Sequence, residues 1–384
     1  MARKQGISRL SSDSARDRSR RTEAVKQNRV AARDPSSRRS KFFLYFRAQF
    51  RRGDDQQGWQ VVLNTLQMKV DSERSRLNWV DIAKGIGIVL VVIGHTIRGL
   101  AAGGVLEWSA AVQLCDSWIY SFHMPVFFFL SGLFLYGSAT KGKLWSFISD
   151  KLRTIAYPYV VWSVITIILK SLLGHIPNTP RWLTDLPLVA YAPVEQFWFL
   201  YVLFLLTVAI GAMFWFGLKP WLVLVIAGLF YTAPLMVGWS VLSQARDYSI
   251  YVALGTTVGP GLISAIATST LLPLVAVVGL AVPVFTQTEP FAAILGIAGC
   301  IALALLLDRV KRGELLSFLG RHSLTIFVVH SIASAAARFV LLVIGVRAPA
   351  IHFMLGIGSG LFVPIVLEIL LAKLHFNYGF TFPR

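Results

Sequence analysis

Apolar runs of about 20 residues recur along most of the chain, and they limit its fold to a small set. A helical run of this length spans the hydrocarbon core of a bilayer. Membrane barrels instead use strands of about 10 residues with alternating polarity. The sequence therefore predicts an all-α, polytopic transmembrane helical bundle. About ten spans are expected, at 79–99, 115–136, 154–174, 195–216, 220–238, 248–267, 270–286, 290–308, 322–345 and 349–372. Glycine and proline within 248–286 leave the boundaries of the sixth and seventh spans open.

The formal net charge of +18 is concentrated before the first span. Residues 1–76 carry 19 Lys and Arg against 8 Asp and Glu, whereas the remaining 308 residues carry 18 against 11. Residues 1–76 are therefore predicted to form a basic, disordered cytoplasmic tail. Residues 1–67 lie upstream of the native start if translation begins at Met68. The excess positive charge lies in this tail and in the connections that membrane topology makes basic. Because this explains the charge, no nucleic-acid partner is predicted.

Two connections between the predicted spans are basic, and they set the orientation. Cytoplasmic connections are enriched in Lys and Arg. Both basic connections are therefore predicted to be cytoplasmic, and an even number of spans places both termini there too. The basic residues are Lys141, Lys143, Lys151 and Arg153 after the second span, and Arg309, Lys311, Arg312 and Arg321 after the eighth.

The stretch DIAKGIGIVLVVIGH begins the first span and carries charges that are unfavourable in hydrocarbon. Asp81 and Lys84 are spaced as an i,i+3 pair at its inner end. His95 follows Lys84 by eleven residues, or about three turns, so both lie on one helix face about 16 Å apart along the axis. Arg98 continues this face. The alternative interpretations are a snorkelling lysine and a buried structural histidine.

Two other spans carry histidines. His123 lies in SFHMPVFFFLSG on the second span, at a depth similar to that of His95, and His330 lies near mid-bilayer in SFLGRHSLTIFVVH. Imidazoles inside spans generally face the bundle interior or a wet cavity, so a polar cavity is predicted. The alternative for His123 is a structural hydrogen bond between helices. Glu195 is a further acid at the outer end of the fourth span.

Five stretches resemble, in order, the acyltransferase-3 family of membrane O-acyltransferases. They are RLNWVDIAKGIGIVLVVIGHT, SFHMPVFFFLSGLF, KLRTIAYPYVVW, FWFLYVLF and LSFLGRHSLTIFVVH. They are most similar to the branch related to fucose 4-O-acetylase. The resemblance covers residues 77–384, which are therefore expected to form the acyltransferase-3 transmembrane domain. It implies ten core spans, an acyl-CoA donor that binds from the cytoplasm, and O-acylation of a sugar in an exported or envelope glycan.

The family also associates function with a basic residue and a histidine ten residues apart on the first span. Lys84 and His95 occupy these positions. The basic member is often Arg in the family, so Lys84 is a departure that gives up bidentate binding but keeps the charge.

The sequence thus predicts an O-acetyltransferase in the bacterial cytoplasmic (inner) membrane. It would transfer acetyl from acetyl-CoA to a sugar hydroxyl, with succinyl transfer as an open alternative and fucose of a lipo-oligosaccharide as one candidate acceptor. His95 is expected to be the general base, because imidazole titrates near neutral pH. His123 is expected to orient the acceptor or to stabilise the oxyanion, and Lys84 and Arg153 are expected to hold the donor phosphates. Asp81, Arg98, Glu195 and His330 are predicted to form a polar cluster with a substrate-binding or structural role. No metal is expected.

Two other classes of protein remain open. A transporter or flippase would use the intramembrane His and Lys to bind substrate or relay protons, and it typically carries an internal repeat. The histidine-bearing stretches do not resemble one another, which disfavours this class. A structural or sensory membrane protein would tolerate replacement of the charges on the first span.

Overall fold

Helices make up all of the regular secondary structure in the part of the chain that the structure describes. The computed structural model describes residues 56–234, 238–286, 289–374, 378–380 and 382, and the described side chains begin at Asn78. The all-α prediction is confirmed. The chain forms two units, residues 1–70 and 71–384, and the second contains every predicted site residue. The prediction of a disordered tail lies outside the described residues before residue 56, whereas residues 56–76 are helical.

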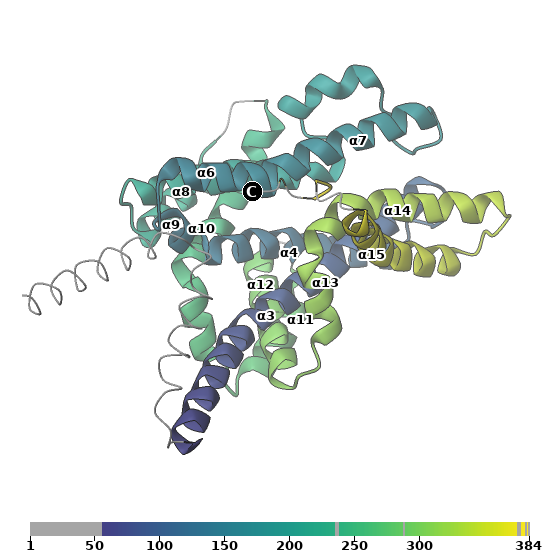
Figure 1. Cartoon of the computed structure of the whole chain (residues 1–384). Helices are drawn as coiled ribbons and strands as arrows, with labels where there is room; N and C mark the ends of the chain where they lie inside the picture. Colours follow the sequence, from purple (N-terminus) through teal and green to yellow (C-terminus); the bar gives the residue numbers. More distant parts are fainter. Residues whose placement is uncertain (1–55, 235–237, 287–288, 375–377, 381, 383–384) are drawn as a thin grey trace, which may run out of the picture. The chain divides into compact units, whose positions relative to one another are not determined.

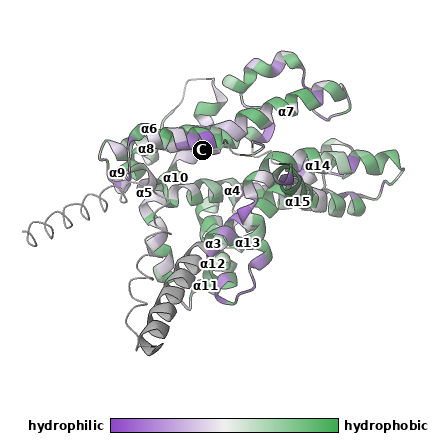
Figure 2. Ribbon diagram, viewed as in Figure 1, coloured by the Kyte–Doolittle hydropathy of each residue, from purple (hydrophilic) through white to green (hydrophobic). Residues whose placement is uncertain are grey.

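A helix lies over each of the ten predicted spans (Figure 1). Seven helical segments are long and apolar enough to cross a membrane, and apolar residues predominate along them (Figure 2). This pattern supports a multi-pass membrane protein. The ten helices are α3 (Gln56–Ala102), α4 (Ala110–Leu133), α7 (Tyr157–Leu173), α8 (Trp198–Trp215), α9 (Pro220–Thr232), α10 (Ser240–Ile266), α11 (Leu272–Phe285), α12 (Phe291–Arg309), α14 (Ser323–Val343) and α15 (Pro349–Lys373).

Shorter elements join these helices. They are α5 (Leu135–Ala139), α6 (Leu144–Lys151), a π-helical segment η1 (Leu152–Ala156), the 3₁₀ segments η2 (Leu183–Ala190) and η3 (Glu195–Phe197), and α13 (Glu314–Arg321). The segments α6, η1 and α7 follow one another without a break, so the third predicted span is the second part of a longer apolar stretch, Leu144–Leu173.

The helix α4 is not among the seven apolar segments, although it lies inside the bundle. It packs against α8, α10, α11 and α12. It carries Asp116 and His123, both buried. A helix surrounded by other helices can hold such groups, because protein rather than lipid faces them. Its polar residues therefore mark an interior position.

Small residues allow α4 and α10 to cross closely. A Cβ atom added at Gly132 would collide with the main-chain carbonyl of Val252, and one added at Gly255 would collide with that of Phe129. Close backbone approach at glycine is a typical packing mode of transmembrane helices. Further along, α10 is broken at Gly259, which has φ 63°. The sequence had left this boundary uncertain, because glycine and proline interrupt the apolar run there.

The segment α13 packs against the start of the first span. Gly85 lies against the main chain of Leu316, and Gly320 lies against the carbonyl of Asp81. The Asn78 amide donates to Asp308 at 2.6 Å. These contacts bring the basic connection after α12 to the same end of the bundle as Lys84, as the charge pattern predicted for two cytoplasmic segments.

Candidate active site

Three helices bring their histidines together inside the bundle. The rings of His95 on α3 and His330 on α14 have centroids 5.0 Å apart. Tyr120 on α4 stands edge-on to His123, with centroids 4.6 Å apart, and lies 6.3 Å from the ring of His95. The sequence had predicted that the intramembrane imidazoles face a polar cavity. In the structure, Tyr120 joins His123 to the other two rings.

The three rings differ in burial and in hydrogen bonding. His123 and His330 are buried, whereas His95 is half-buried. His123 Nδ1 lies 2.7 Å from the carbonyl of Ile119, and His330 Nδ1 lies 2.7 Å from that of Phe327. A carbonyl only accepts hydrogen bonds, so each of these nitrogens carries the hydrogen.

In the neutral form, Nε2 of both His123 and His330 therefore carries a lone pair. Ser331 Oγ lies 3.2 Å from Nε2 of His330. Within the described part of the chain, neither ring nitrogen of His95 has a hydrogen-bond partner. His95 is thus the most accessible ring of the three, and both of its nitrogens are free to accept or donate a proton.

Arg98 and Asp116 form a bidentate pair beside the histidines. Arg98 donates from Nε and from a terminal nitrogen to the two carboxylate oxygens, both at 2.8 Å. The guanidinium carbon lies 3.3 Å from the centroid of the Tyr120 ring. A bidentate pair fixes the orientation of the guanidinium as well as bringing the two charges together. It therefore holds the guanidinium over one face of the Tyr120 ring.

Gly94 leaves room for this tyrosine. A Cβ atom added at Gly94 would lie 3.0 Å from Cε2 of Tyr120 and 3.6 Å from Cζ. The hydroxyl-bearing end of the phenol therefore packs against the backbone next to His95. The glycines of the first span serve close helix approach: Gly85 meets α13, Gly87 meets Phe127 and Gly94 meets Tyr120.

Lys84 lies at the other end of the same helix. Its Nζ is 4.0 Å from Oδ1 of Asp81, and the side chain of Lys84 is 38% exposed. Since α3 is continuous between them, Lys84 and His95 are about 16 Å apart along the axis. The i,i+3 pair predicted from the sequence is present. Arg153, on η1, is exposed.

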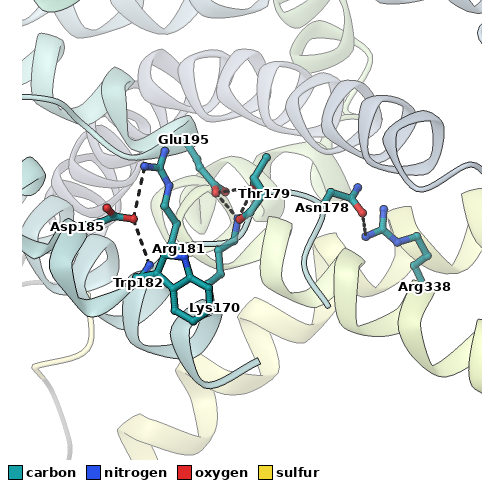
Figure 3. Close-up of polar contacts among 8 residues, drawn as sticks. All are labelled: Lys170, Asn178, Thr179, Arg181, Trp182, Asp185, Glu195 and Arg338. Carbon is teal, nitrogen blue, oxygen red and sulfur yellow. Dashed lines mark hydrogen bonds and ion pairs between the residues drawn. The ribbon is translucent and has the colours of Figure 1, made fainter. Parts of the chain in front are cut away.

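Glu195 belongs to a separate polar cluster near the far end of α3 (Figure 3). Its carboxylate accepts a short hydrogen bond from Lys170 and a second from Thr179 at 3.0 Å. Arg338 donates to the carbonyl of Gly99 and, at 3.1 Å, to Asn178. These contacts attach the connection after α7 to α3, α8 and α14.

Glu195 also has an unusual backbone conformation, with φ 50°. A non-glycine residue in this left-handed region is strained by the order of 1–3 kcal/mol, and it persists only where its surroundings fix it. The bonds to Lys170 and Thr179 supply this restraint.

Glu195→Gln is expected to loosen this connection. The variant keeps the shape of the side chain but removes the carboxylate charge, so the ion pair with Lys170 is lost and the bond from Thr179 becomes a neutral one. Both side chains of the pair, Lys170 and Glu195, are partly exposed, at 17% and 22%. The lost free energy should therefore lie near the lower end of the range for hydrogen bonds to charged groups. It corresponds to a population of molecules with this connection opened that is about tenfold larger. Trypsin cleavage after Arg181, which lies within this connection, should accelerate to that extent in right-side-out vesicles.

The control is Glu107→Gln, an exposed acid in the first connection, which should leave the cleavage rate unchanged. Equal rates for wild type and Glu195→Gln would contradict the restraining role. Cleavage only in inverted vesicles would overturn the predicted orientation.

The structure unites some of the predicted residues and separates others. His95, His123, His330 and Arg98 lie in one cluster, whereas Asp81 with Lys84, Arg153 and Glu195 lie elsewhere. Sequence reasoning missed Tyr120. A signal for it was available, because Asp116, Tyr120 and His123 are spaced i, i+4 and i+7 and so share one helix face.

Comparisons with known proteins give a family match and a distant relative. The profile of the acyltransferase-3 family, described as an acyltransferase domain, matches residues 77–369. Nodulation protein NolL of Mesorhizobium japonicum is 27% identical over 145 residues, which are 37% of this chain and 38% of that protein. No solved structure matches the chain. The matched region contains the whole histidine cluster and Lys84.

Proposed function

Because the chain belongs to the acyltransferase-3 family, a family of membrane acyltransferases, we propose that it is an O-acetyltransferase of the bacterial inner membrane. Its donor would be acetyl-CoA, and its acceptor a sugar hydroxyl of an exported or cell-envelope glycan. The candidate acceptor is fucose of a lipo-oligosaccharide, as in the branch that the sequence resembles. The observation that carries the proposal is the accessible His95 ring next to two buried imidazoles inside an apolar bundle.

His95 would act as the general base. It removes the proton from the sugar hydroxyl as the oxygen attacks the thioester carbonyl, a role that suits imidazole near neutral pH. Among the described residues, no main-chain group forms a hydrogen bond with its nitrogens. The lone pair on Nε2 of His123 would accept a hydrogen bond from the acceptor and orient it, and His330 would support His95 from the opposite helix.

The donor would be held at the opposite end of α3. Lys84 and Arg153 are the cations proposed to bind the phosphates of CoA. Lys84 would bind them as a point charge and not through bidentate hydrogen bonds. The separation of about 16 Å along the helix between Lys84 and His95 is comparable to the reach of a pantetheine arm. This arrangement lets the nucleotide stay at the predicted cytoplasmic end while the thioester reaches the histidines.

The proposal is tested on the glycans of cells with and without the protein. Mass spectrometry of the envelope glycans should show the loss of one acetyl group per acceptor unit when the gene is deleted, restored by the wild-type chain. Glycans that keep their acetyl groups but accumulate on the cytoplasmic side would instead indicate a flippase. The proposal would be contradicted if deletion of the gene changed neither the acetyl content of the glycans nor their distribution across the membrane.

A further inference from the structure

We propose that the hydroxyl of Tyr120 is a catalytic hydrogen-bond donor that stabilises the negative charge on the acyl oxygen during transfer. This inference rests on the proposed function and deepens it. Acyl transfer creates an oxyanion on the former carbonyl oxygen, and a fixed donor aimed at that position is usually a large contributor to the rate.

The hydroxyl of Tyr120 is a buried donor with no hydrogen-bond partner in the described part of the chain. Buried polar groups are generally paired, so each exception calls for an explanation. The ring stands edge-on to His123 and close to His95, and its hydroxyl-bearing end packs against Gly94. This unpaired donor therefore lies next to the proposed base.

The neighbouring imidazoles are poorly suited to this role. In their neutral forms His123 and His330 each use the ring N–H on a main-chain carbonyl, at 2.7 Å in both cases. Their remaining nitrogens only accept. An oxyanion needs a donor, so an uncommitted hydroxyl in the same cluster supplies what these rings lack.

Arg98 prepares the phenol for donation. Its guanidinium lies over the ring face at 3.3 Å and is held by the fork to Asp116. A cation over the face of an aromatic ring is attracted to its electron density. It draws that density away from the hydroxyl, which strengthens the O–H as a donor, and it also fixes the plane of the ring. Arg98 and Asp116 are therefore positioning residues.

The step is an addition followed by an elimination. The sugar oxygen bonds to the thioester carbon while its proton passes to His95, and the carbonyl π pair moves onto oxygen, where Tyr120 donates to it. The pair then returns, the C–S bond breaks, and the CoA sulfur leaves with the proton from the His95 imidazolium. The products are the sugar ester and free CoA. Tyr120 keeps its proton throughout.

Tyr251 provides a matched control. Its hydroxyl is also buried and lacks a partner among the described residues, but it lies on α10 with Tyr248 as its aromatic neighbour. Removing a buried, unpaired hydroxyl is neutral or stabilising when the group is only structural. Thr96→Val is a local control, because the unpaired hydroxyl of Thr96 follows His95 in sequence while its side chain faces Gly356 on α15.

The experiment compares Tyr120→Phe, Tyr251→Phe and Thr96→Val in proteoliposomes with acetyl-CoA and a fucosylated lipo-oligosaccharide. Tyr120→Phe is expected to lower kcat by about 10²–10³-fold, with the KM for acetyl-CoA unchanged and the melting temperature equal to wild type or higher. The two control variants should keep wild-type kcat. The inference is overturned if Tyr120→Phe keeps a kcat within about threefold of wild type, or if the control variants lose as much.

His95→Gln separates failure of this inference from failure of the proposed function. If His95→Gln is inactive while Tyr120→Phe is active, the acyltransferase function stands and the role of Tyr120 is wrong. If wild-type protein transfers no acetyl group at all, the proposed function itself fails.

Discussion

Replacement of His95 by glutamine is expected to lower kcat for acetyl transfer by about 10²–10⁴-fold, the usual contribution of a positioned general base. Glutamine fills a similar volume and keeps hydrogen-bonding capacity, but its amide accepts no proton near neutral pH. His95 is half-buried and has no hydrogen-bond partner among the described residues, so the exchange leaves no broken bond and no large cavity. The KM for acetyl-CoA should be unchanged, because the donor phosphates would bind at the other end of α3.

The matched control is His322→Gln. His322 directly precedes the apolar helix α14, but its Nδ1 lies 2.8 Å from Glu368 and its ring packs near Phe318 rather than in the histidine cluster. This variant should keep a kcat within about threefold of wild type, as expected for a substitution outside the site. Full activity of His95→Gln at normal expression would show that another group removes the proton.

Lys84→Ala is expected to raise the KM for acetyl-CoA by about tenfold and to leave kcat nearly unchanged. Hydrogen bonds to charged groups contribute about 1.5–3 kcal/mol, and the 38% exposure of Lys84 places the effect at the lower end of that range. A higher KM at constant kcat is the signature of lost binding that is equal in the ground and transition states. Steady-state kinetics at varied acetyl-CoA measures both constants.

Lys84→Arg separates charge from side-chain identity. It keeps the charge and should keep a KM near that of wild type, as should Lys141→Ala, which removes an exposed lysine from another basic connection. A snorkelling lysine would behave differently. In that case Lys84→Ala would lower the amount of inserted protein while the KM stayed at the wild-type value.

Much of the bundle was predictable because hydrophobic length is a property of one segment at a time. The helix of each predicted span is present, and the pair Asp81 with Lys84 follows from spacing alone. The break at Gly259 was visible only as an uncertain boundary. Hydropathy does not indicate which helices become neighbours, so the position of α13 beside Gly85 could not be predicted.

The same distinction holds for the site. His95, His123 and His330 stood out individually, because imidazole is rare in hydrocarbon. Their grouping depends on how α3, α4 and α14 pack. Tyr120 was overlooked because a tyrosine in a span is ordinary. Its place on one helix face with Asp116 and His123 was the available signal, and its contacts with Arg98 and His123 show its position in the cluster. The pairing of Glu195 with Lys170 joins residues 25 apart in sequence and had no local signal.

The most direct test is transfer by purified protein in proteoliposomes that contain a fucosylated lipo-oligosaccharide, with acetyl-CoA radiolabelled in the acetyl group. For a membrane acyltransferase with His95 as its base, label should appear as an ester on the glycan, with one free CoA thiol released per acetyl transferred. The rate of label transfer by His95→Gln should be lower by about 10²–10⁴-fold. Movement of the glycan across the bilayer without incorporation of label, or equal incorporation by wild type and His95→Gln, would contradict this mechanism.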